Sequence, residues 1–364
     1  MADTESVSHG DLIVCACANR EYCARDVIEA AFFRGEAEPV WMEFLRGAAA
    51  EDRAVEQELD LPDGAIEGAA EEFRYQHDLI TAEETEQWLA DRGLTMGDFT
   101  DYFSRQYWRT NLDEEIEPET VGFAPASTEL RETFIAEVIL SGLLDRWSIG
   151  LMWRLAALAT DASEKVDRER TAQELKIFLK RNKMDASELQ PWLKRIGRDE
   201  EWLDQMLATE AAYRAQCDTV LTSQAQTKEM ATMRLPLTRF AAEMIELESR
   251  DAAKEALFCI REDGMSMQEV ATEGRYPYRT VSFLQEDVPD DLQQKFLSVV
   301  AGDVLEPLPR GDGFQLYRVT EKIEPRADDP AVRQRVDDRI LRRHFSELAS
   351  KTVQPRLSSL MEGS

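Results

Sequence analysis

Residues 302–319 read Gly-Asp-Val-Leu-Glu-Pro-Leu-Pro-Arg-Gly-Asp-Gly-Phe-Gln-Leu-Tyr-Arg-Val. Glycine and proline interrupt the chain twice, first around Gly302 and Pro307 and again at Gly311 and Gly313, as they do in turns. After Gly313, apolar and polar side chains alternate, which is typical of a half-buried β-strand. The segment therefore predicts two turns followed by a strand over residues 314–321.

The preceding residues show strand and helix patterns in a defined order. Residues 239–247 and 279–284 alternate as strands do. Apolar residues at helical spacing predict helices over residues 251–263, 266–273 and 290–300, each ending near a glycine. Together with the last strand, residues 235–325 are expected to form a small domain with the order βααβαβ.

This domain resembles a parvulin-type peptidyl-prolyl isomerase. The family reads Gly-Glu-Ile-Ser-x-Pro-Val, a short turn and Gly-Tyr-His-Ile-Ile-x-Val where this chain has residues 302–319. Gln315 stands in the histidine position of that motif. A second family histidine, in Ala-x-His-Ile-Leu of the first strand, corresponds to Met244. A methionine cannot join a hydrogen-bond network and a glutamine can do so only in part, so we expect weak or absent isomerase activity.

The resemblance also implies where a peptide would bind. Val288 and Leu292 correspond to the two family residues that grip the proline ring, and Phe283 lies on the adjoining strand. The family's Gly-Gly-Asp-Leu-Gly-Trp-Phe motif, which carries an acidic or cysteine residue, is reduced to Tyr-Pro-Tyr-Arg-Thr-Val-Ser-Phe at residues 276–283. The expected peptide-binding set contains no catalytic residue and consists of Phe283, Val288, Leu292, Met244 and Gln315. The alternative interpretation is that the apolar members are ordinary core.

The first two thirds of the chain are expected to be helical, over residues 21–34, 39–58, 65–78 and an apolar pair within 130–158. The segment around residues 72–93, a helix, a turn and a second helix, is repeated 104 positions later. A third helix follows each copy. This pattern resembles the helical N-terminal domains of SurA-like chaperones. The gap-free matches are Ile80, Ala82, Glu84, Trp88, Leu89 and Gly93 with Met184, Ala186, Glu188, Trp192, Leu193 and Gly197.

These patterns predict an α+β protein that is predominantly α-helical, with four parts. Residues 1–120 and 121–234 hold the two helical repeats, the second together with the apolar hairpin. Residues 235–325 form the parvulin-like domain. Residues 326–364 form a C-terminal amphipathic helix, over 328–360, that packs back on the helical domain.

Charge and cysteine content limit the classes of partner. The net charge is −29, and residues 1–130 alone contain 31 Asp and Glu against 9 Arg and no Lys. Such a surface repels phosphate backbones, so we expect no nucleic-acid partner. It either attracts basic segments of a partner or serves only to keep the protein soluble. No apolar run is long enough to span a membrane.

The cysteines and the N-terminus bear on compartment and cofactors. Cys15, Cys17 and Cys23 are expected to be small apolar residues rather than zinc ligands, and we expect neither a metal nor a cofactor. Residues 1–6 are acidic where a secretory signal is positively charged, which predicts a cytoplasmic protein.

The leading hypothesis for function is a cytoplasmic peptide-binding chaperone or maturation factor. Its client would be a peptide or an unfolded protein, including a dedicated precursor peptide or a maturing enzyme. Three alternatives remain open at this point. One is an active peptidyl-prolyl isomerase with an atypical site. The second is a different peptide-modifying enzyme, metal-dependent through acidic residues such as Glu71, Glu72, Glu83 and Glu84. The third is a purely structural subunit.

Overall fold

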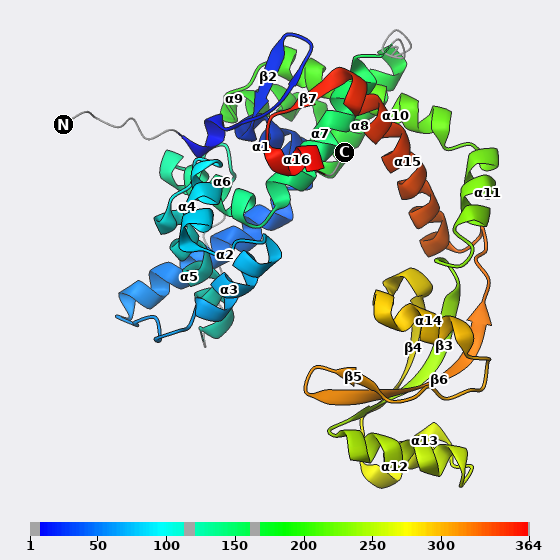
Figure 1. Cartoon of the computed structure of the whole chain (residues 1–364). Coiled ribbons are helices and arrows are strands. Elements are labelled where there is room, and N and C mark those ends of the chain that lie inside the picture. The colour runs from blue at the N-terminus through cyan, green and yellow to red at the C-terminus, as the bar shows by residue number, and fades with distance from the viewer. Residues whose placement is uncertain (1–7, 113–120, 161–167, 363–364) are drawn as a thin grey trace. The chain divides into compact units, whose positions relative to one another are not determined.

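The computed structural model describes residues 8–112, 121–160 and 168–362 of the 364-residue chain. The chain divides into two compact units, residues 1–218 with 344–364 (unit 1) and residues 219–343 (unit 2). The predicted α+β class with mostly helical content is confirmed (Figure 1). None of the described helices is both long and apolar enough to cross a bilayer.

Unit 1 combines helices with a three-stranded antiparallel sheet of order β2-β1-β7. Its strands are β1 (Ile13–Cys17), β2 (Arg20–Cys23) and β7 (Val353–Pro355). Its helices are α1 (Ala24–Phe33), α2 (Glu38–Glu56), α3 (Glu67–Gln76), α4 (Ala82–Ala90), α5 (Met96–Asn111), α6 (Thr128–Leu140), α7 (Leu143–Leu158), α8 (Arg168–Arg181), α9 (Leu189–Arg195), α10 (Glu200–Val220) and α16 (Ser358–Glu362).

This sheet corrects two expectations. The helix predicted from residue 21 begins at Ala24, because Arg20–Cys23 pairs with β1 instead. The C-terminal helix, expected to reach residue 360, ends at Thr352, and the next three residues pair with β1 on its other side. Pairing between the two ends of the chain is a tertiary interaction, which local periodicity does not encode.

The core of unit 1 is aromatic. The rings of Trp41 and Phe134 lie 5.0 Å apart at 88°, and Phe44 packs against both. The hairpin of α6 and α7 contributes the largest share of fully buried apolar side chains, as its sequence predicted. Within this core, Arg105 is 5% exposed and pairs with Glu137 at 3.1 Å and Glu51 at 3.6 Å.

Helices α3–α5 and α8–α10 have matching local structure. Thr81 and Asp185 each form a reciprocal capping box with the glutamate three residues later. The turn before each cap differs in length: Leu79 N–H bonds to the carbonyl of Arg74, and Met184 N–H bonds to that of Leu179. Met184 is therefore equivalent to Leu79, and the gap-free match to Ile80 is wrong by one residue. Equivalent buried positions are Phe73, Leu89, Phe99 and Phe103 in the first copy and Phe178, Leu193, Leu203 and Leu207 in the second.

Helix α15 (Pro330–Thr352) contributes to both units, since the division falls between Arg343 and His344. Val332, Val336 and Ile340 belong to a unit 2 core cluster. Phe345 is fully buried in unit 1, where its ring stacks on Tyr213 at 4.7 Å and on Trp153 at 5.8 Å.

Unit 2 is built on a four-stranded antiparallel sheet of order β4-β3-β6-β5. The predicted order βααβαβ is present, with one additional short strand, β5, before the last. Its elements are α11 (Ser223–Thr232), β3 (Arg239–Leu247), α12 (Arg250–Arg261), α13 (Met267–Gly274), β4 (Tyr278–Leu284), α14 (Asp290–Ser298), β5 (Leu308–Arg310) and β6 (Gly313–Ile323).

The two faces of this sheet have separate cores. Helices α12 and α13 cover one face, where Ile245, Leu247 and Leu316 join their apolar side chains. Helix α14 covers the other face, where Phe240 and Val319 pack against Phe296. Figure 1 shows α14 on one side of the strands and α12 with α13 on the other. Strand alternation therefore assigns each sheet residue to one of two environments.

Candidate peptide-binding face

The residues expected from the sequence to bind a peptide lie where the unit 2 sheet packs against α14. Met244, Phe283 and Gln315 are on the strands, Leu292 is on α14, and Val288 precedes that helix. Along β3, Phe240, Ala242 and Met244 point to the α14 face, since alternate residues share a side. Register places Phe283 of β4 opposite Phe240, and Tyr317 of β6 opposite Met244. Gln315 lies two positions along β6 from Tyr317 and shares its side.

Aromatic rings form the centre of this face. Phe283 lies 5.2 Å from Phe296 at 85° and 5.9 Å from Phe240 at 24°. Tyr317 completes the group, 5.4 Å from Phe296 and 6.4 Å from Phe283. Edge-to-face arrangements of this kind stabilise aromatic clusters beyond the apolar area that they bury. The cluster holds Phe283 and Tyr317 in place while both remain half-buried.

The five expected residues differ in accessibility. Phe283, Leu292 and Gln315 are half-buried, and each is in part accessible to a ligand. Val288 is 7% exposed within the cluster of Phe240 and Phe296, and Met244 is 2% exposed, so both line the core beneath the face. Their part in peptide binding stays a prediction.

The polar groups of the face form pairs with one another. The Tyr317 hydroxyl donates a hydrogen bond to Oε1 of Gln315 at 2.9 Å. Burial raises the pKa of this tyrosine above its ordinary value, so the phenol stays protonated near neutral pH. Arg279 forms an ion pair with Glu246 across the strands. Sequence reasoning missed Tyr317, although its position two residues after Gln315 in an alternating strand was a usable signal.

No histidine lies on this face, because the three histidines of the chain, His9, His77 and His344, all fall outside residues 219–343. The position that corresponds to one family histidine holds the thioether of Met244, and the other holds a carboxamide already bonded to Tyr317. The face therefore offers apolar and aromatic contact beside one amide, one hydroxyl and the Arg279–Glu246 ion pair.

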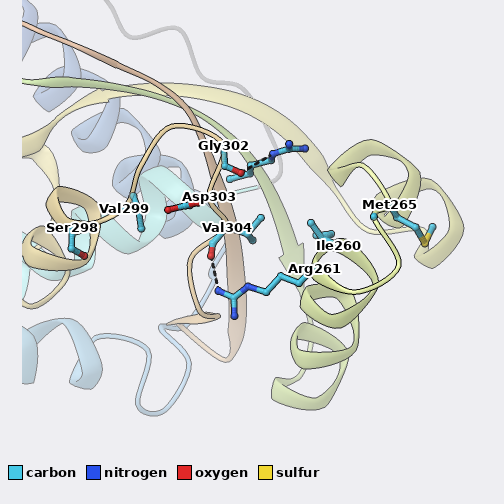
Figure 2. Close-up of a pocket in the computed structure, with 10 residues that line it drawn as sticks. Ile260, Arg261, Met265, Ser298, Val299, Gly302, Asp303 and Val304 are labelled. Atoms are coloured by element: carbon cyan, nitrogen blue, oxygen red, sulfur yellow. Dashed lines mark hydrogen bonds between the residues drawn. The ribbon is translucent and has the colours of Figure 1, made fainter.

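A separate cavity of about 530 Å³ lies in unit 2 between the C-terminal end of α12, residues 298–304 and β6 (Figure 2). Its arginines already have protein partners. Arg261 donates to the carbonyl of Val304 at 2.7 Å and pairs with Glu306 at 2.6 Å, and Arg318 donates to the carbonyl of Gly302 at 3.3 Å. None of the expected site residues lines it. These bonds fasten the turn around Gly302 to α12 and β6.

One of the four acidic residues considered for a metal site, Glu84, has a structural role. Among the described residues, no group of three or more His, Cys, Asp or Glu side chains is arranged to hold a metal ion. Glu84 accepts backbone hydrogen bonds from Ile80 and Thr81, and these bonds lower its pKa. Glu84 therefore completes the capping box that begins at Thr81.

Two of the three N-terminal cysteines, Cys15 and Cys17, are buried, and Cys23 is half-buried. Cys15 is fully buried in the unit 1 core, and burial raises its pKa to about 12. Cys23 caps α1, and its thiol donates to the carboxylate of Asp26 at 3.3 Å. The five cysteines are all free.

Comparisons with known proteins come from structure alone, since no family model and no curated protein sequence matches the chain. The chain is similar to the peptidylprolyl isomerase PrsA of Bacillus cereus, with 11% identity over 64% of this chain and 87% of that chain and a TM-score of 0.38. It is also similar to the peptidylprolyl isomerase PrsA of Bacillus anthracis, with 13% identity over 58% of this chain and 96% of that chain and a TM-score of 0.30. A third similar structure is described among SurA-like chaperones of Campylobacter jejuni. Its identity is 11% over 66% of this chain and 96% of that chain, and its TM-score is 0.20.

Proposed function

We propose that this chain is a cytoplasmic peptide-binding chaperone or maturation factor that holds a peptide or unfolded protein client, with little or no isomerase activity. The observation that carries the proposal is the face beside α14, where Phe283, Leu292 and Tyr317 are half-buried over an aromatic core. Apolar side chains held in place by a packed core give a client contact area without a large ordering cost.

The low isomerase activity follows from what the face lacks. Isomerisation breaks no bond and requires stabilisation of a twisted amide against a rotational barrier of roughly 20 kcal/mol. Met244 cannot donate a hydrogen bond, and Gln315 is already bonded to the Tyr317 hydroxyl. This pair therefore offers little that would lower the rotational barrier.

Charge and thiol state support the remaining parts of the proposal. The excess of carboxylates in residues 1–130 attracts clients with basic segments. Free cysteines, among them the buried Cys15 and Cys17, suit the reducing cytoplasm.

Binding of a fluorescein-labelled, reduced and carboxymethylated α-lactalbumin, followed by fluorescence anisotropy, tests the proposal. Phe283→Ala should weaken binding several-fold. Phe258→Ala is the matched control, because Phe258 is 58% exposed on α12, on the other side of the sheet. Thermal unfolding of both variants shows whether the domain is intact.

A protease-coupled assay on a proline-containing tetrapeptide measures isomerase activity on the same samples. We expect no rate above background for the wild type or for Gln315→His. Equal client affinity of wild type and Phe283→Ala, or a clear isomerase rate in the wild type, would reject the proposed function.

A further inference from the structure

The unit 2 sheet has two edges that are protected to different degrees. The β5 edge is three residues long and contains Pro309, which cannot donate a ladder hydrogen bond. The β4 edge is seven residues long, contains no proline and carries one charged side chain, Arg279, already paired with Glu246. Folded proteins usually shield a long edge with proline, charge or a bulge, and β4 has none of these beyond that one arginine.

The hydrogen-bond pattern shows which β4 groups point outward. Glu246 N–H donates to the carbonyl of Pro277 at 3.0 Å, and Gln285 N–H donates to the carbonyl of Thr238 at 2.9 Å. In an antiparallel pair these bonds alternate, so the odd-numbered residues of β4 bond to β3. The backbone N–H and C=O groups of Tyr278, Thr280 and Ser282 therefore point away from the sheet.

Within unit 2, all of which the structure describes, no other group bonds to these outward-pointing backbone groups. The side chains of Thr280 and Ser282 are exposed. At the C-terminal end of the strand, the Leu284 N–H is bonded to the Asp287 carboxylate at 3.2 Å. The open part of the edge therefore has a defined length of about five residues, from Tyr278 to Ser282.

Building on the proposed function, we infer that a client segment binds by adding an extended strand to β4. Backbone hydrogen bonds to Tyr278, Thr280 and Ser282 would hold the segment without reading its sequence. Alternate client side chains would extend the row of Val281 and Phe283 on the α14 face, where apolar residues fit. The occupant is thus an extended segment with apolar residues at every second position and no proline where its N–H must bond to β4.

This mode predicts a preference opposite to that of a prolyl isomerase. Proline lacks the N–H that a strand partner must donate, so a central proline should weaken binding. Clients with alternating valine and threonine should bind best.

The probe for the test is a fluorescein-labelled ten-residue peptide of alternating valine and threonine with two terminal lysines, added to the full-length protein. Its counterpart carries N-methyl groups on three consecutive central amides, which removes their donors. One or two of the three methylated amides face β4, because strand residues bond to one neighbour in alternation. Each lost hydrogen bond costs about two- to tenfold in affinity, so we expect the N-methylated peptide to bind roughly tenfold more weakly.

Substitutions at Thr280 test the same contact from the protein side. Thr280→Pro removes an outward N–H and leaves the bonds to β3 in place, and an edge strand tolerates proline at such a position. Thr280→Val keeps the N–H and is the matched control. We expect about tenfold weaker binding for the first and unchanged binding for the second. If circular dichroism shows that Thr280→Pro is unfolded, the N-methylated peptide decides.

Hydrogen–deuterium exchange of residues 278–284 locates the contact. The probe should protect up to three amides, those of Tyr278, Thr280 and Ser282, because the odd-numbered amides already bond to β3. Binding without this protection, or equal affinity for both peptides, overturns strand addition but leaves the proposed function standing if Phe283→Ala still weakens binding. Failure of the wild type to bind any probe overturns both. The same amides could instead become protected without the probe as the protein concentration rises, with a dimer seen in ultracentrifugation. That result assigns the edge to a second copy of the chain and overturns client pairing.

Discussion

Replacing Phe345 by alanine removes the aromatic side chain that α15 buries in unit 1. The ring is fully buried and stacks on Tyr213 and Trp153, so its removal leaves a large cavity. Phe→Ala changes in packed cores cost about 3–5 kcal/mol. For a unit of this size, each kcal/mol shifts the melting temperature by roughly 2–4 °C, so we expect a decrease of at least about 6 °C.

Tryptophan fluorescence isolates the response of unit 1. The seven tryptophans all lie at or before residue 202, so none is in unit 2. Tyr75→Ala is a matched control within the same unit, because Tyr75 is 83% exposed, and it should change stability by less than about 0.5 kcal/mol. Equal melting temperatures of Phe345→Ala and Tyr75→Ala, measured by tryptophan fluorescence, would refute the burial of Phe345 in unit 1.

Three further predictions concern unit 1. Thr81→Ala and Asp185→Ala should each cost about 1 kcal/mol in urea unfolding, because each removes one capping box. Arg105→Met should lower the free energy of unfolding by about 3–5 kcal/mol, because it leaves the Glu137 carboxylate unpaired. The double variant with Glu137→Gln should regain a large part of this free energy. An equal loss in the single and double variants would contradict the prediction. Burial raises the pKa of the Cys15 thiol from 9.0 to about 12, so the folded state favours the protonated thiol. The contribution of this thiol to the free energy of unfolding is therefore complete below pH 9 and is lost as pH rises towards 12. Urea titrations at pH 8 and pH 10 measure this loss. Between the two pH values the free energy of unfolding should fall less in Cys15→Ala than in the wild type.

The six elements of the βααβαβ order were predictable to within about two residues because local signals mark their limits, whereas α11 and β5 were not predicted. Ser249 and Ser266 cap α12 and α13 through their side chains, and the strands alternate in burial. Long periodic segments with caps are the most readable part of any sequence. Two short strands of unit 1, by contrast, were read as parts of helices. Arg20–Cys23 and Val353–Pro355 are strands because β1 lies between them, and no local pattern carries that information.

The candidate site was predictable in position more than in detail. The shared side of Met244, Gln315 and Phe283 follows from strand alternation once the register is known. The bond from Tyr317 to Gln315 was not predicted, because it depends on side-chain conformation as well as spacing. Similarly, the burial of Val288 depends on how Phe296 packs, and sequence gives only its apolar character.

The pairing of β1 with β7 also affects how the protein is made. Cys17 lies opposite Val353, so the first strand must wait for a partner that leaves the ribosome roughly 340 residues later. At about 5–20 residues per second, that interval is on the order of twenty to seventy seconds. During this time the edge of β1 that pairs with β7 has no strand partner. A protein proposed to hold unfolded clients would then itself pass through a stage in which it needs the same protection.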